Sequence, residues 1–128
     1  MKSSSWLVLF SKARVPARAD VLRALASVQG CSVREVATDD YQVTCGSHRF
    51  AVALSTQPHV REEAREFVES AGATLPNPDE VATFDARFEI LFPRDEIGDL
   101  FNPLLAIADE LAMMTGGAVY EPDNDAFQ

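Results

Sequence analysis

The chain has 128 residues and a mass of 14.0 kDa, which is enough for one domain but not for two of ordinary size. Its apolar fraction of 47% and charged fraction of 24% are typical of globular proteins rather than disordered or fibrous ones. Eleven Lys and Arg residues against twenty Asp and Glu residues give a net charge of −9. This charge disfavours nucleic acid or an anionic membrane as a partner, because both would repel the surface. We therefore expect a single domain over residues 1–128, with cationic partners still possible.

Two cysteines, Cys31 and Cys45, are too few for a disulfide framework. The apolar run Trp6–Phe10 is five residues long, shorter than the ~7–15 residues of a signal-peptide core. No segment approaches the ~18–20 apolar residues of a membrane span. We therefore expect a cytoplasmic protein with free thiols, in which the two cysteines form a bridge only if adjacent strands bring them together.

The first half of the chain predicts a strand, a helix and a set of antiparallel strands. Trp6–Phe10 is typical of a buried central strand. Val15-Pro16 is expected to open a helix that reaches Val28, with Gly30 at the left-handed cap position. Apolar residues at period two, separated by turn residues, then predict strands near 32–37, 41–45 and 49–55.

The second half begins with a change to helical spacing over residues 60–71, between Pro58 and Gly72. The opposite face of this helix is expected to be a solvated acidic side, formed by Glu62, Glu63, Glu66 and Glu69. Residues 73–80 are rich in proline and predict a connecting loop. A strongly apolar strand, which includes Phe84, should then end at Pro93.

Asn102-Pro103 is typical of a helix N-cap followed by proline at the first helical position. It predicts that the main helix begins at residue 103 and that 95–101 form a separate turn or short helix. Gly116-Gly117 should end the main helix before a closing strand at Ala118–Tyr120, and the polar tail from about Glu121 should fray.

This order of elements predicts an α+β fold: a mainly antiparallel sheet of five to six strands, with three helices packed on one face in a ferredoxin-like arrangement. The main helix has the broadest apolar face of the chain, formed by Leu104, Ile107, Ala108 and Leu111. We expect this face to pack on the two most apolar strands, through Leu7, Leu9, Ile90 and Phe92.

The residues capable of soft metal binding or thiol chemistry are Cys31, Cys45, His48 and His59. Their overall spacing matches no common structural zinc site. No nucleophile elbow, phosphate-binding loop or zinc-protease motif accompanies them. We therefore expect no catalytic residues, no metal and no cofactor. The alternative is a small enzyme or zinc-binding protein that uses Cys45 and His48.

Charge is distributed unevenly along the chain. Residues 1–60 hold seven basic and four acidic groups, a balance of +3, whereas residues 61–128 hold four basic and sixteen acidic groups, a balance of −12. Clustered like charge destabilises the compact state by self-repulsion, so an external role is a reasonable explanation, although a solvated face is another. We predict that this half meets a cationic protein partner through the candidate contacts Glu62, Glu66, Glu69, Asp95, Glu96 and Asp99.

The segment from Leu111 to Pro122 combines the end of a helix, the sequence Thr-Gly-Gly and a strand. In this ending, and in size, acidity and layout, the chain resembles the immunity proteins of bacterial toxin systems. Those proteins neutralise a cognate effector by covering its active site. The resemblance implies a non-catalytic bacterial protein of the cytoplasm, and it carries over no functional residue. A second alternative is a self-associating regulatory domain that binds a small ligand between its sheet and helices.

Overall fold

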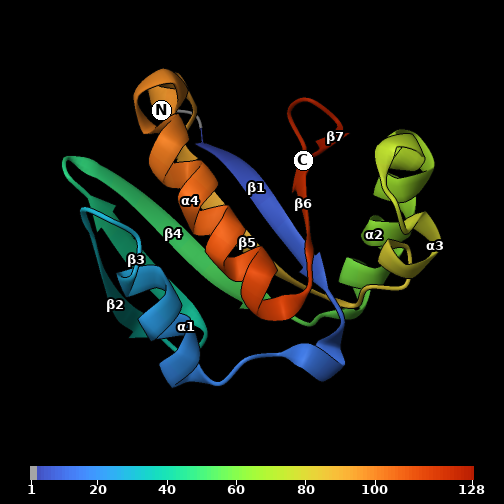
Figure 1. The fold of residues 1–128 in the computed structure, drawn as a ribbon, viewed down its shortest axis with the longest axis horizontal. Helices are drawn as coiled ribbons and strands as arrows, with labels where there is room; N and C mark the ends of the chain where they lie inside the picture. Colours follow the sequence, from blue (N-terminus) through green and yellow to red (C-terminus); the bar gives the residue numbers. More distant parts are fainter. Residues whose placement is uncertain (1–2) are drawn as a thin grey trace.

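The computed structural model describes residues 3–128, whose strands form one antiparallel sheet in the order β2-β3-β4-β5-β1-β6-β7 (Figure 1). The strands are β1 Ser3–Phe10, β2 Cys31–Ala37, β3 Asp40–Cys45, β4 His48–Ser55, β5 Ala86–Pro93, β6 Ala118–Glu121 and β7 Ala126–Phe127. The α-helices are α1 Arg18–Ala26, α2 Pro58–Ala71, α3 Pro78–Val81 and α4 Ile97–Thr115. The α+β class and the antiparallel sheet are confirmed. The described residues contain seven strands and four α-helices, more than the sequence predicted.

Both faces of the sheet carry helices, so the expectation of helices on one face is wrong. Along β1, Trp6, Val8 and Phe10 belong to the core beneath α1 and α4, whereas Leu7 and Leu9 belong to a smaller core with residues of α2 and α3. Successive side chains of a strand point to opposite faces. A strand buried on both faces therefore reads as a continuous apolar run, as residues 6–10 do.

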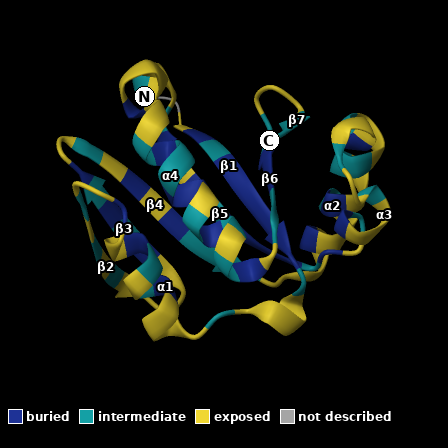
Figure 2. Cartoon of the chain, in the orientation of Figure 1, coloured by how far each residue is buried: buried dark blue, intermediate teal, exposed yellow. Residues whose placement is uncertain are grey.

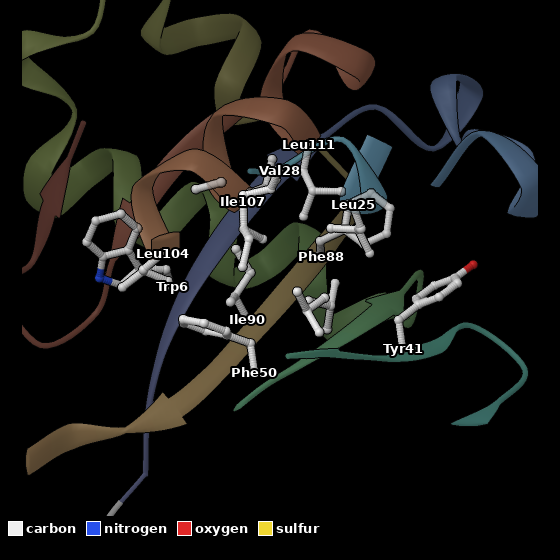
Figure 3. Packing of buried hydrophobic residues seen from close by; sticks show 14 of the residues in the cluster. Trp6, Leu25, Val28, Tyr41, Phe50, Phe88, Ile90, Leu104, Ile107 and Leu111 are labelled. Carbon is white, nitrogen blue, oxygen red and sulfur yellow. The ribbon is translucent and has the colours of Figure 1, made fainter. Parts of the chain in front are cut away.

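Helix α4 packs on the sheet through the face that the sequence predicted. Figure 3 shows Leu104, Ile107 and Leu111 pointing from α4 toward the strands, with Ile90 beneath them. Phe92 belongs to the same core, so the prediction is confirmed for β5. It is wrong for Leu7 and Leu9, which lie on the other face with Tyr120.

The beginning of α4 differs from the prediction. The helix starts at Ile97 and continues through Pro103, so Asn102 is not its N-cap. Proline at position 103 removes one backbone hydrogen bond, the one that would reach the Asp99 carbonyl. Leu100 and Leu104 are fully buried on either side of this gap. Their burial stabilises a continuous helix where local capping preferences favour a break.

Two adjacent glycines end α4 as predicted, and each has its own requirement. Gly116 adopts the left-handed conformation, with φ +68°, that caps the helix. A Cβ on Gly117 would lie 2.6 Å from the Leu9 carbonyl oxygen of β1. Gly117 therefore allows the chain to pass close to the sheet before it enters β6.

The remaining boundaries agree with the prediction in part. Strands β2, β3 and β4 begin and end within one residue of the predicted ranges. Helix α1 begins at Arg18 rather than at Val15-Pro16, and Gly30 lies in the turn before β2. The expected loop at 73–80 contains a 3-10 helix and α3, and Phe84 precedes β5. The register of β2 shifts between Glu35 and Ala37.

The C-terminal segment, expected to fray, forms β7 and is attached to α2. Tyr120 is buried, and its ring stacks on Phe67 of α2 with the ring centroids 4.1 Å apart. Its hydroxyl donates to Asp125 Oδ1 at 2.5 Å, and Asp125 also accepts a hydrogen bond from Ser70 of α2. Phe127 of β7 also contacts Tyr120, with the ring centroids 4.9 Å apart. A buried aromatic cluster therefore holds a stretch that is polar in composition.

The Tyr120 hydroxyl should make stability fall in alkali. Burial, followed by the hydrogen bond to Asp125, raises the pKa of Tyr120 above its ordinary value of 10.0. The folded state therefore favours the protonated phenol, whose contribution is complete below pH 10.0 and lost as pH rises toward the folded-state pKa. Tyr120→Phe should lower the free energy of unfolding by about 1 kcal/mol at neutral pH.

Urea denaturation of both proteins from about pH 7 to about pH 11 tests this prediction. Burial also raises the pKa of Tyr41, so wild type and variant share that part of the alkaline loss. The gap between the two proteins should narrow as the pH rises. A constant gap would show that the Tyr120 hydroxyl does not carry the effect.

Candidate functional site

The six carboxylates predicted as partner contacts form two separate groups. Glu62, Glu66 and Glu69 lie on α2, and we call them the α2 acidic face. Asp95, Glu96 and Asp99 lie at the beginning of α4, and we call them the α4 acidic end. Figure 1 shows α2 and the beginning of α4 at opposite sides of the molecule. All six side chains are exposed except that of Glu96, which is half-buried.

The α2 acidic face is mixed in charge and has few apolar neighbours. Val60 and Ala64 are fully buried beneath the helix. The exposed residues Arg61 and Arg65 alternate with the glutamates and line a shallow groove with Ala82 and Thr83. This surface offers charge without an apolar anchor.

Glu63 was expected on the solvated side of α2 with the other glutamates, but its side chain reaches the sheet. Its carboxylate accepts a hydrogen bond from Arg87 Nη1 at 2.6 Å. Arg87 comes from β5, its side chain is 9% exposed, and its Nε also donates to Glu89 at 2.8 Å. Two carboxylates thus neutralise a buried guanidinium. Glu63 fixes α2 to the sheet and does not belong to the outer acidic surface.

The α4 acidic end adjoins Ile97 in the sequence, and Ile97 lines a pocket of about 220 Å³ that has both apolar and polar walls. The antiparallel pairing of β1 with β5 brings Trp6 and Phe92 to the same end of the sheet, and both line the pocket. Phe101 of α4 meets Trp6 edge to face, with the ring centroids 5.8 Å apart. Ile97 completes the apolar lining. Ile97 and Phe101 remain 37% and 40% exposed, so the pocket presents aromatic and aliphatic surface to solvent.

A hydrogen-bonded cluster closes one side of this pocket. Arg94 Nε donates to Ser4 Oγ at 2.7 Å, and Ser4 Oγ donates to Asp123 Oδ2 at 2.5 Å. Arg94 Nη2 also lies 3.4 Å from Asp123 Oδ1. Among residues 3–128, the only cation lining the pocket is therefore paired with a carboxylate. Glu121, also in the lining, and the α4 acidic end leave the surroundings negative.

The sequence did not reveal this pocket, although one signal was present. Ile97 and Phe101 are four residues apart and lie on one side of a helix that starts at residue 97. The apolar stripe that faces the core runs instead through Leu100, Leu104 and Ile107. Because the helix was predicted to start at residue 103, Ile97 and Phe101 were placed outside it. Their position on a second apolar face of the helix was therefore missed.

Cys45 and His48 do not form the reactive pair of the alternative interpretation. The β2–β3 register places Cys31 directly opposite Cys45, and the two form a disulfide. The expectation of free thiols is wrong, because strand pairing brings the cysteines together. His48 Nδ1 lies 2.9 Å from Glu96 Oε1. In this structure Cys45 has no thiol to act as a nucleophile or a zinc ligand.

The described residues show neither a metal-binding cluster nor a helix suited to cross a membrane. Residues 3–128 contain no group of three or more His, Cys, Asp or Glu side chains placed to hold a metal ion. None of the helices in this part of the chain is both long and apolar enough to cross a membrane. Comparison with protein families, with curated proteins and with solved structures found no match to the chain.

Proposed function

We propose that this protein is a non-catalytic binding module that recognises a cationic protein partner through the α4 acidic end and its adjacent pocket. The observation that carries this proposal is the exposure of Ile97 and Phe101 next to three carboxylates. Protein interfaces combine an apolar anchor, which supplies most of the affinity, with charged residues around it. The α2 acidic face has the charge alone and is the weaker candidate.

We further propose that the partner is a bacterial toxin or effector and that binding neutralises it. Support comes from the resemblance to immunity proteins in size, acidity and the Thr115-Gly116-Gly117 ending. That resemblance also implies the cytoplasm, which we keep as the proposed compartment. The Cys31–Cys45 disulfide weighs against it, because such bonds are rare in the cytosol. Alkylation and mass analysis of protein from the native host tests the compartment, and an intact bridge would contradict the proposal.

Binding kinetics test the site. The product of the neighbouring reading frame is the first partner to assay, because an immunity gene is expected beside its toxin. The triple variant Asp95→Lys, Glu96→Lys, Asp99→Lys should slow association by about tenfold or more, since charge acts mainly on encounter. Wild-type association should also slow as salt shortens the Debye length to ~8 Å, while dissociation changes less.

A matched variant and an apolar variant complete the test. Glu62→Lys, Glu66→Lys, Glu69→Lys makes the same change of charge on the other surface and should affect association much less. Phe101→Ala should speed dissociation by about tenfold or more, because it removes the apolar anchor. If the α2 triple variant has the larger effect, the partner binds to α2. If both triple variants bind like wild type at every salt concentration, the acidic residues form only a solvated surface.

A further inference from the structure

The sheet face opposite α4 is only partly covered. Helices α2 and α3 cover it over β1 and β6, where Leu7 and Leu9 are buried. The remaining side chains on this face come from β2 to β5 and from the beginning of β1. Apart from Arg87 of β5, which Glu63 of α2 covers, none of them is buried, and Figure 2 shows the resulting alternation of buried and exposed residues along β4. We call this surface the open sheet face: Ser3, Ser5, Ser32, Arg34, Asp40, Gln42, Thr44, Arg49, Ala51, Ala53, Leu91 and Pro93.

The open sheet face carries two arginines without carboxylate partners. Arg34 lies opposite Gln42 and donates to Gln42 Oε1 from Nε at 3.1 Å and from Nη2 at 2.8 Å. Arg49 lies opposite Thr44 on the next pair of strands. Among residues 3–128, no carboxylate oxygen lies within 4.0 Å of either guanidinium. In a chain of net charge −9, these two arginines outnumber Asp40, the exposed carboxylate that lies opposite Ala53 on the same face.

Beside Arg49, toward β5, the sheet is apolar and hollowed. A shallow hollow of about 420 Å³ is lined by Ala51, Leu91 and Arg49 among others. Leu91 is 38% exposed, and Val36, at the border of the hollow, is 54% exposed. Apolar surface beside unpaired cations suits an occupant that carries carboxylates on long side chains, because their aliphatic stems can cover the hollow.

The same side of the molecule carries such an occupant, namely α2. Its acidic face points away from Ala64, the residue that it buries against the sheet. Arg61 and Arg65 line a groove together with Glu62, Ala82 and Thr83, and Glu63 reaches Arg87 of β5. One half of this side is therefore raised by α2 and exposes the glutamates of the α2 acidic face, and the other half is the lower sheet surface that exposes Arg34 and Arg49.

We propose that the protein forms a two-fold symmetric homodimer in which α2 of each copy docks on the open sheet face of the other. A two-fold interface must be complementary to itself, so that each surface meets its counterpart twice. Here the raised half of one copy fills the low half of its partner, and Glu62 and Glu66 meet Arg34 and Arg49. The α4 acidic end lies on the opposite side of the sheet and stays accessible. The dimer is therefore independent of the proposed function.

Charge exchange between two variants gives a specific test. The sheet variant Arg34→Glu, Arg49→Glu and the helix variant Glu62→Arg, Glu66→Arg each place like charges at both contacts. Each alone should weaken dimerisation by at least about tenfold, measured by sedimentation velocity over a concentration series. Mixed together they should form a heterodimer close to wild type in affinity, because every helix–sheet contact again joins opposite charges.

The control variant Asp95→Arg, Asp99→Arg changes charge by the same amount on the other side of the sheet and should dimerise like wild type. Circular dichroism and thermal unfolding establish that each variant is folded. A wild-type protein that stays monomeric up to near-millimolar concentration would overturn the proposal. So would a dimer that tolerates both the sheet and the helix variants, or a mixture that fails to recover the heterodimer.

Discussion

Leu111→Ala should lower the free energy of unfolding by about 2–5 kcal/mol, the range for truncating a fully buried leucine. Leu111 of α4 is completely buried in the core that α1 and the sheet share with this helix. Figure 3 shows it beside Leu25 and Val28. The substitution removes apolar surface from the core and leaves a cavity that elements on three sides cannot close. Urea denaturation monitored by circular dichroism measures the change.

Met113→Ala is the matched control in the same helix. Met113 is 79% exposed, so its truncation should change the free energy of unfolding by less than about 0.5 kcal/mol. A Leu111→Ala midpoint within error of wild type would mean that this face of α4 is not buried in solution. That result would contradict the packing of α4 on the sheet.

Removing the disulfide should also have a large effect. Cys31 and Cys45 are separated by 14 positions in the sequence, and the bridge restricts the unfolded chain over the whole β2–β3 hairpin. Cys31→Ala, Cys45→Ala should therefore lower the free energy of unfolding by about 2–4 kcal/mol. Denaturant unfolding under non-reducing conditions measures the loss.

Reductant provides the control for this prediction. Wild type in reductant should lose about as much stability as the double variant, and the variant should not respond to reductant. Wild-type stability that is equal with and without reductant would show that the bridge does not form. In that case Cys45 regains a thiol beside His48, and the alternative of thiol or zinc chemistry returns.

The sequence predicted those elements whose signal is local. The prediction was wrong where burial in the core determined the structure instead. Period-two patterns and turn residues placed β2, β3 and β4 within one residue. The Asn102-Pro103 capping signal was overridden because Leu100 contributes to the core. The tail was predicted to fray because it is polar. It forms an ordered hairpin instead, because two aromatic residues, Tyr120 and Phe127, pack together and hold it in place.

The sequence predicted which carboxylates are candidate contacts, but it did not predict which of them lie together on one surface. Helical spacing predicted the exposure of Glu62, Glu66 and Glu69, and five of the six carboxylates are exposed. Their division into two groups depends on where α2 and α4 lie on the sheet, which a single sequence does not reveal. Pairing of the cysteines required the strand register, because residues 31 and 45 meet only when β2 and β3 align end to end.

The register shift in β2 bears on how the sheet behaves at high concentration. β2 is the outermost strand at one end of the sheet, and the shift leaves Val36 without a directly opposed residue. An irregular border strand with charged side chains is a poor template for further strands. The other border, β7, has only two residues. Neither border offers a long regular ladder to another chain, so the protein should resist fibrillar aggregation.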